Sequence, residues 1–241
     1  MTTSTSLFDY VEEFKALFED DARITSVYWN SVYQVEGQPT WTEENLLLGK
    51  ESLTEALVLE DGRRLEFDIL PQAFFQTNTL QAQRLYSLVM EAAGLSGKET
   101  VFDLYCGTGT IGLFCAHKAK EVVGIEINEA AVESARSNAR KNKIQNVSFN
   151  LGSVEARLGG VSQRPDIVIV DPPRAGLGEK VVESTAAFKA PKIVYVSCNP
   201  TTMARDLKQF AELGYKTESV QPVDMFPQTH HVECVALLKL I

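Results

Sequence analysis

The chain has two parts that differ in how hydrophobic and polar residues alternate. From residue 100 onward, short apolar runs predict buried strands near 100–104, 121–126, 146–151, 166–170 and 192–197. Helical spacing of apolar residues predicts helices near 110–118, 128–141, 178–188 and 200–213. This alternation indicates an α/β fold with a mostly parallel sheet covered on both faces. Two last β-prone runs, 216–223 and 232–240, are expected to form an antiparallel edge.

Residues 1–70 are expected to form a separate small α+β unit, with residues 71–241 as the larger domain. Apolar positions 7, 10, 11, 14, 17 and 18 have helical spacing, with Ser6 as the N-cap. A β-prone run at 24–35 breaks at 37–39. The runs 53–59 and 64–70 flank Glu60-Asp61-Gly62, which is a strong hairpin signal. After a link at 71–76, a helix is predicted at 79–93, ending at Gly94.

Composition and charge narrow the class of protein. Hydrophobic residues make up 44% and charged residues 23%, as in ordinary globular proteins. No apolar run approaches the roughly 20 residues of a membrane span, and the first residues lack the basic and apolar regions of a signal peptide. The four cysteines include no C-x-x-C pair, which argues against zinc and iron–sulfur sites. We therefore expect a cytoplasmic protein without a membrane anchor or a metal.

The net charge of −9 is unfavourable for a nucleic-acid partner, because phosphates attract basic proteins. The charge is unevenly distributed, however. Residues 1–70 hold 15 acidic and 5 basic side chains, a net of −10, and the remainder holds 17 and 18, a net of +1. The acidity belongs to the first part of the chain.

A glycine turn follows the strand expected at 100–104. Gly107 and Gly109 lead into a helix, an arrangement that brings backbone N–H groups close to a ligand. The third glycine of the dinucleotide fingerprint is absent, and Asp103 at the strand end disfavours phosphate. Glu126 ends the next strand, where a ribose diol would bind. This combination favours S-adenosylmethionine over NAD.

Further polar residues follow the later strands, and the carboxyl ends of parallel strands meet at one rim. Ser153 follows the third strand, and Asp171-Pro-Pro-Arg174 follows the fourth, where two prolines hold the acid rigidly. Cys198 follows the fifth strand, just before a helix. The positive end of a helix dipole favours a thiolate, so Cys198 is in position for a nucleophile.

The remaining cysteines, Cys106, Cys115 and Cys234, lie in or beside apolar runs and are interpreted as buried apolar residues. Strand alternation puts His231 and Glu233 on one face. A carboxylate among apolar neighbours has a raised pKa and suits a proton acceptor. Two ligands from one strand are too few for a metal site.

Five motifs in order resemble the uracil-5 RNA methyltransferases, which are S-adenosylmethionine enzymes that make 5-methyluridine in tRNA and ribosomal RNA. The resemblance covers the chain from about residue 45. The motifs are Ala-Phe-Phe-Gln-Thr-Asn at 73–78, Asp-Leu-Tyr-Cys-Gly-Thr-Gly-Thr at 103–110, Asp-Pro-Pro-Arg-Ala-Gly at 171–176, Val-Ser-Cys-Asn-Pro at 196–200 and His-Val-Glu-Cys-Val at 231–235.

The resemblance implies a Rossmann-like class I methyltransferase fold for residues 71–241, with RNA as the substrate. Cys198 matches the family nucleophile and Glu233 the base. Phe74 matches a ring that stacks on the target base, and we place Arg174 with it at the substrate. Cofactor positions are matched by or assigned to Gln76, Tyr105, Gly107, Thr110, Glu126, Ser153 and Asp171.

The chain departs from the family pattern at three points. It has no room for the usual N-terminal oligonucleotide-binding barrel, it lacks the four-cysteine cluster of some members, and Ser153 stands where relatives often have Asp or Asn. The chain is thus expected to be a short form or the catalytic half of a longer one, with a partner supplying RNA-binding surface. Two alternatives stay open: an enzyme that methylates amino groups of adenine or guanine, and a non-catalytic cofactor-binding module.

Overall fold

The computed structural model describes residues 10–35, 37, 40–71, 73–158 and 163–241, so the expected helix cap at Ser6 lies outside the described residues. The chain divides into two compact units. One runs to Thr54 and includes Asp68–Pro71, and the other combines Glu55–Phe67 with the chain after residue 71. The division expected from the sequence, at residues 70 and 71, differs because most of one hairpin belongs to the second unit.

The N-terminal unit contains a helix, α1 (Val11–Ala16), and an antiparallel pair of strands. The expected strand is β1 (Ser26–Tyr33), and it pairs with β2 (Trp41–Gly49), which the sequence pattern did not predict. The polar run at 42–45 hides the alternation of β2. Tyr33 and Trp41 are partners in this ladder, and their rings stack with centroids 5.0 Å apart.

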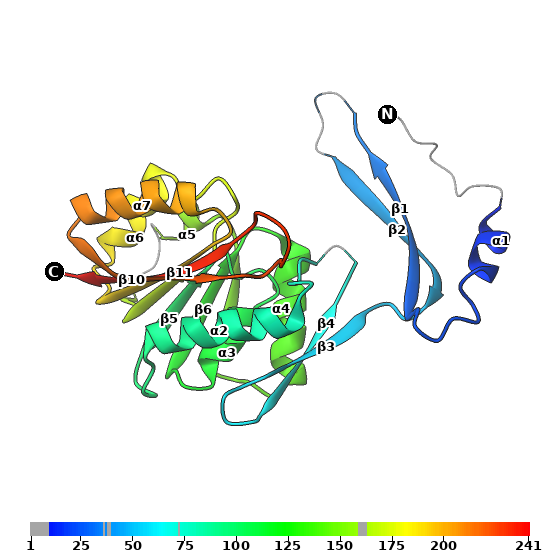
Figure 1. Ribbon diagram of the computed structural model, residues 1–241, viewed down its shortest axis with the longest axis horizontal. Helices are drawn as coiled ribbons and strands as arrows, with labels where there is room; N and C mark the ends of the chain where they lie inside the picture. Colours follow the sequence, from blue (N-terminus) through cyan, green and yellow to red (C-terminus); the bar gives the residue numbers. More distant parts are fainter. Residues whose placement is uncertain (1–9, 36, 38–39, 72, 159–162) are drawn as a thin grey trace. The chain divides into compact units, whose positions relative to one another are not determined.

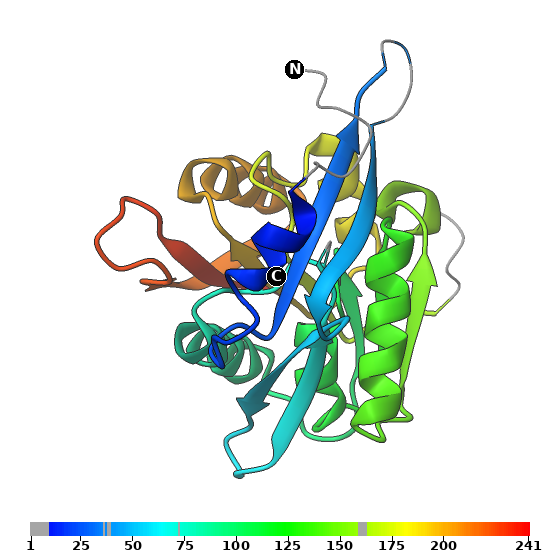
Figure 2. The same ribbon diagram turned by 90° about the vertical axis from the view of Figure 1, so that its right-hand side faces the viewer.

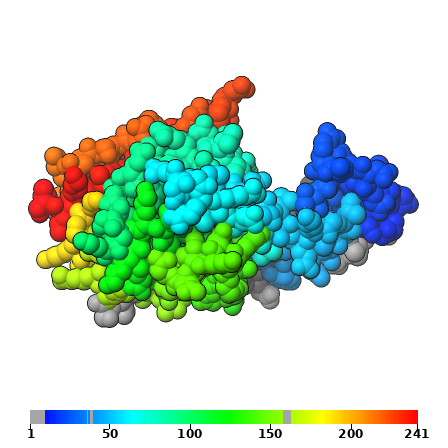
Figure 3. Space-filling view, turned by 90° about the horizontal axis from the view of Figure 1, so that it is seen from below, coloured from blue at the N-terminus to red at the C-terminus, as the bar shows by residue number. Residues whose placement is uncertain are grey.

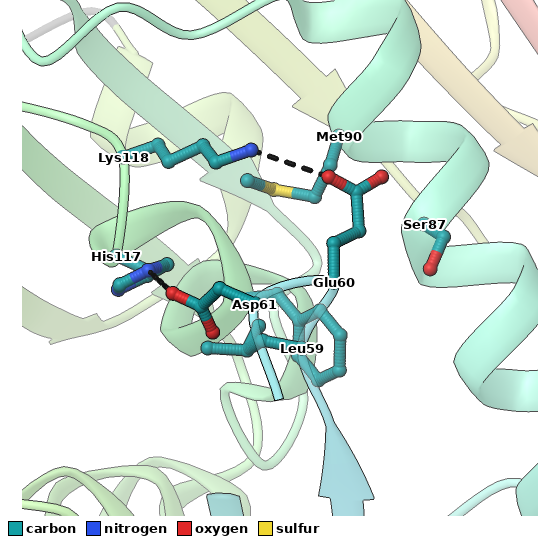
Figure 4. Close-up of a pocket in the computed structure, with 8 residues that line it drawn as sticks. Leu59, Glu60, Asp61, Ser87, Met90, His117 and Lys118 are labelled. Atoms are coloured by element: carbon teal, nitrogen blue, oxygen red, sulfur yellow. Dashed lines mark hydrogen bonds and ion pairs between the residues drawn. The ribbon is translucent and has the colours of Figure 1, made fainter. Parts of the chain in front are cut away.

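The predicted hairpin is confirmed as β3 (Leu53–Val58) and β4 (Arg64–Ile69). Figure 3 shows residues of this part of the chain, in cyan, packed against later residues of the second unit, in green. Asp61 contacts His117 Nε2 at 2.9 Å, and Lys118 donates to Glu60 at 3.2 Å (Figure 4). Apolar side chains of the hairpin join the main core behind these contacts: Leu57, Leu59, Leu65 and Phe67.

The second unit is built on a seven-stranded sheet (Figure 1). Its strand order is β10-β11-β9-β8-β5-β6-β7, parallel except for the antiparallel strands β11 and β10 at one edge. The doubly wound α/β prediction is confirmed, including that edge. The strands are β5 (Thr100–Leu104), β6 (Glu121–Glu126), β7 (Val147–Leu151), β8 (Ile167–Val170), β9 (Lys192–Ser197), β10 (Tyr215–Val223) and β11 (Glu233–Leu240).

Helices cover both faces of this sheet. One face carries α2 (Thr79–Ala93), α3 (Thr110–Ala116) and α4 (Glu129–Lys141), with α4 along β6 and β7 (Figure 2). The other carries α5 (Val154–Leu158), α6 (Glu179–Ala187) and α7 (Pro200–Glu212). Only α5 was not predicted, since one short turn has too few positions for a periodic pattern. No described helix is long and apolar enough to cross a membrane.

The buried strands are mostly apolar because each side of the sheet has its own core, and Asp103 in β5 is a buried exception. In β8, Ile167 and Ile169 join the core under α2, α3 and α4, whereas Val168 and Val170 join the core under α6 and α7. Successive side chains therefore have no polar face to occupy. Several polar residues therefore lie at or beyond the carboxyl ends of the strands. The order of the strands in the sheet changes direction at β5, which has β6 on one side and β8 on the other. In open α/β sheets, ligands bind at such a point.

Candidate active site

A cleft of about 570 Å³ opens beyond the carboxyl ends of the central strands. It brings together all the residues predicted for the site except Ser153. Those residues are Phe74, Gln76, Tyr105, Gly107, Thr110, Glu126, Asp171, Arg174, Cys198 and Glu233. The expectation that the polar residues meet at one rim is therefore correct for these side chains.

Ser153 is not among the residues that line the cleft. Its hydroxyl accepts the backbone N–H of Ala156 at 3.2 Å, and its carbonyl accepts the N–H of Arg157 at 3.0 Å. Ser153 thus begins α5, and its side chain is used as a helix cap. The sequence pattern gave no indication of this cap because α5 itself was not predicted, and a cofactor role for Ser153 stays a prediction.

The glycine turn after β5 is held by the carboxylate of Glu126. The N–H of Gly107 donates to Glu126 Oε2 at 3.0 Å, and the N–H of Asn128 donates to Oε1 at 2.8 Å. Tyr105 enters the turn with φ of 64°, an uncommon value for a residue with a side chain. These bonds fix the carboxylate at the end of β6 and leave one lone pair on each oxygen for a ligand.

The ring of Phe149 packs so close to two positions near this turn that only glycine fits there. A Cβ on Gly109 would lie 2.7 Å from the Phe149 ring, and a Cβ on Gly124 would lie 2.5 Å from it. Gly109 also has φ of 81°, which side chains rarely adopt. Close packing of this ring therefore requires glycine in both β6 and the turn.

The loop that carries Asp171 and Arg174 is anchored by the buried carboxylate of Asp206. This carboxylate accepts the N–H of Leu177 at 2.8 Å and the hydroxyl of Tyr195 at 2.7 Å. Gly176, with φ of 81°, passes so close that a Cβ would lie 2.6 Å from Asp206 Oδ2. The glycine that ends the Asp-Pro-Pro-Arg-Ala-Gly motif is thus required by this approach.

Three carboxyl groups lie at or near the cleft: Asp171 and Glu233 line it, with Asp171 partly buried, and Asp103 is fully buried without lining it. Burial raises the pKa of Asp171 to about 8, with added effects from Glu233 and Asp103. Burial also raises the pKa of Glu233, as the sequence led us to expect, and Arg174 opposes the shift. The pKa of Asp103 is raised to about 7 by burial; the N–H of Gly112 lowers it, but no donor reaches either Asp103 oxygen with full hydrogen-bond geometry among the described residues. The site therefore favours a cationic ligand.

Cys198 differs from the sequence-based expectation. Burial raises the pKa of the Cys198 thiol, Glu233 raises it further, and Arg174 lowers it. The net direction is opposite to the expected lowering, because burial and the carboxylates of Glu233 and Asp171 outweigh the effects that lower the pKa. At the start of α7, the Asn199 side chain accepts the N–H of Thr201 at 3.1 Å. Because these effects disfavour the Cys198 thiolate, a positive charge close to the sulfur is needed to stabilise it.

One further expectation is corrected, and a second is confirmed with an addition. β11 begins at Glu233, so strand alternation does not place His231; instead His231 Nδ1 lies 3.2 Å from Arg174 Nη2. Cys106 is buried, as expected, but it also lines the cleft. No group of three His, Cys, Asp or Glu side chains within the described ranges could hold a metal ion.

Sequence reasoning missed Tyr86 among the residues that line the cleft. Tyr86 belongs to the buried stripe of α2, and burial raises its hydroxyl pKa, with Asp171 adding to the effect. Helical spacing marks such a residue as core and says nothing about its hydroxyl. A tyrosine within an otherwise aliphatic stripe was the only available signal.

Comparison with known proteins places this site in a family. The family model described as tRNA (uracil-5-)-methyltransferase matches residues 39–241. The chain belongs to this family. One curated relative is an uncharacterized RNA methyltransferase of Clostridium tetani (strain Massachusetts / E88), which is 49% identical over 195 residues, covering 81% of this chain and 42% of the relative.

A second curated relative comes from Streptococcus mutans serotype c (strain ATCC 700610 / UA159). It is also named an uncharacterized RNA methyltransferase. It is 41% identical over 241 residues, covering 99% of this chain and 52% of the relative. The chain thus spans about half the length of the curated relatives it matches.

A solved structure resembles the fold over almost the whole chain. The crystal structure of Pyrococcus abyssi tRNA (uracil-54, C5)-methyltransferase in complex with S-adenosyl-L-homocysteine is 36% identical, with a TM-score of 0.75. The match covers 98% of this chain and 54% of that chain. The class I methyltransferase fold implied by the sequence motifs is confirmed.

Proposed function

We propose that this family member transfers a methyl group from S-adenosylmethionine to C5 of a uridine in RNA, through a covalent bond between Cys198 and C6 of the base. The observation that carries the proposal is that Cys198 and Glu233 line one cleft. They come from the ends of two neighbouring strands, β9 and β11. A nucleophile and a proton acceptor are the two groups that C5 methylation requires.

The residues at the cleft fit the cofactor. The carboxylate of Glu126 keeps free lone pairs for the ribose hydroxyls. The carboxyl of Asp171, which lines the cleft, and the buried carboxyl of Asp103 give the site an affinity for positive charge. A Cβ on Gly107 would meet no atom within 4 Å, so the turn leaves space for a ligand against its backbone. When bound, the cofactor supplies an electrophilic methyl group on a sulfonium.

Uracil C5 is a weak nucleophile until a thiolate adds to C6. Addition of the Cys198 thiolate forms an S–C6 bond and moves the C5=C6 electron pair toward C4 and O4, giving an enolate. The enolate takes the methyl group at C5, and the electron pair of the S–CH₃ bond that breaks stays on the sulfur, which becomes a neutral thioether. Glu233 then removes the C5 proton, and the C–H electron pair re-forms C5=C6 as the S–C6 bond breaks. The Cys198 thiolate is regenerated, and one proton is released per methyl group.

Phe74 supports base binding at the mouth of the cleft. Its side chain is 75% exposed although it lines the cleft. An exposed ring at such a position gives a flipped base a surface for stacking, which is how single-stranded RNA bases are held. The first part of the chain carries a net charge of −10, which repels the phosphate backbone of RNA. We therefore also propose that a partner or a further segment supplies part of the RNA-binding surface.

The test is incubation with labelled S-adenosylmethionine and unmodified tRNA or ribosomal RNA, followed by digestion to nucleosides. We expect label in 5-methyluridine, and none with Cys198→Ala. RNA containing 5-fluorouridine should form a covalent adduct with the wild type, because fluorine replaces the proton that Glu233 removes. Label in methyladenosine or methylguanosine would instead support an amino-methylating enzyme. Cofactor binding without transfer to any RNA would support the non-catalytic alternative.

A further inference from the structure

The cleft is poor in positive charge for a site that uses a thiolate. Arg174 is the only Lys or Arg among the described residues that line it, whereas Glu126, Asp171 and Glu233 line it too. Negative neighbours and burial both disfavour a thiolate. Arg174 lowers the pKa of Cys198 and of Glu233, so it is the group that opposes these effects.

The backbone of Arg174 is tied to the segment that follows the nucleophile. Its carbonyl accepts a hydrogen bond from Asn199 Nδ2 at 3.1 Å and another from Thr202 Oγ1 at 3.2 Å. Asn199 is the residue next to Cys198, so the two loops are joined. The backbone of Arg174 is thereby held, but a long side chain needs a contact of its own to stay in one place.

That contact is His231. We propose that His231 is a positioning residue, which holds the Arg174 guanidinium in the cleft as the counter-charge to the Cys198 thiolate. The inference rests on the proposed function, which gives Cys198 its role. His231 Nδ1 lies 3.2 Å from Arg174 Nη2. A guanidinium only donates, so Nδ1 is the unprotonated acceptor and the ring is neutral, with its proton on Nε2.

The surroundings of His231 keep it in this state. Burial, His230 and Arg174 all lower the pKa of His231, and His230 and Arg174 are the ionisable groups that act on it. Its backbone N–H donates to Thr229 Oγ1 at 3.2 Å, and the Phe226 ring meets its ring edge-on, with centroids 6.5 Å apart. The groups that act on Cys198 itself are Glu233, Arg174 and Asp171.

The test measures the pH dependence of Cys198 alkylation by iodoacetamide in the full chain, by mass spectrometry of its peptide, without cofactor or RNA. We expect His231→Leu and Arg174→Gln each to move the midpoint up by about one pH unit, with about tenfold slower alkylation near neutral pH. His231→Asn, whose amide oxygen replaces Nδ1, should restore the wild-type midpoint, whereas His231→Gln, which places its amide farther out, should not.

His230→Leu is the matched control, because the His230 ring centroid lies 4.2 Å from that of His231, whereas it is His231 that contacts Arg174. It should keep the wild-type midpoint. Adding His231→Leu or His231→Gln to Arg174→Gln should cause no further shift. A wild-type midpoint in Arg174→Gln, or in both His231→Leu and His231→Gln, would overturn the inference. Because alkylation needs no substrate, this failure differs from absence of methyl transfer.

Discussion

At the scale of single residues, the site is governed by how burial acts on ionisable groups. The same loss of solvent that makes Glu233 a better proton acceptor makes Cys198 a poorer thiolate. Asp171 is affected most clearly, because burial raises its pKa to about 8. Without a cationic ligand in the cleft, Asp171 therefore carries a proton at neutral pH, and this state has a measurable effect on stability.

Asp171→Asn is expected to flatten the dependence of stability on pH. The folded pKa of about 8 lies above the ordinary value of 3.8, so the stability that Asp171 contributes is fully present below pH 4 and is lost as pH rises through 8. The amide stays neutral, so the wild type should lose on the order of a few kcal/mol more than the variant between pH 5 and 8. Urea unfolding across this range measures the difference.

Asp224→Asn provides the control, since its side chain is exposed. That variant should follow the wild-type curve. Parallel curves for Asp171→Asn and the wild type would show that the Asp171 carboxyl is already ionised in the folded protein.

At the scale of elements, helix ends connect the site to the fold. Asn78 begins α2 by accepting the N–H of Gln81 at 3.2 Å, and its amide also donates to the carbonyl of Met225 at 3.1 Å. The second bond ties α2 to the segment between β10 and β11, which carries His231. One side chain thus caps a helix and holds a segment next to the cleft.

Asn78→Ala is expected to lower the free energy of unfolding by more than the loss of a helix cap alone. Asn128 caps α4 in the same way, accepting the N–H of Ala131 at 3.1 Å, and gives the matched comparison. Asn128→Ala should cost about 1 kcal/mol. Asn78→Ala should cost about 1 kcal/mol more through the second bond, and amide exchange should rise at 224–232 only in that variant. Equal costs with unchanged exchange would contradict the link.

At the scale of the whole molecule, most of the hairpin of β3 and β4 belongs to the same compact unit as the seven-stranded sheet. Its apolar side chains, Leu57, Leu59, Leu65 and Phe67, are in the same core as α2 and α3. The contacts of its tip with His117 and Lys118 (Figure 4) lie at the edge of that core. We therefore propose residue 55, and not residue 71, as the start of the smallest stable catalytic unit.

Two truncated chains test this boundary. A chain of residues 55–241 should unfold cooperatively in urea, whereas a chain of residues 73–241 should be less stable by several kcal/mol, at about 1.5–3 kcal/mol for each lost apolar side chain. Phe67→Ala in the full chain should cost about 3–5 kcal/mol. Equal midpoints for the two truncated chains would restore the boundary at residue 71.

Local patterns in the sequence were enough for every strand except β2, for every helix except α5, and for the place of the site. Runs such as 167–170 identify buried strands because each side chain must enter one of two cores. Asn78 and Gly94 bound α2 correctly because caps act within a single turn. Polar residues after parallel strands must meet at one rim, so the cleft and most of its residues followed from order alone.

Tertiary structure decided the rest, because those features depend on contacts between distant residues and on solvation. The sequence could not indicate that Ser153 caps a helix, that Tyr86 reaches the cleft, or that Arg174 meets His231. The pKa of Cys198 is raised because its thiol is partly buried and because the carboxylate of Glu233 lies near it. Burial is a property of the packed chain, and no local pattern encodes it.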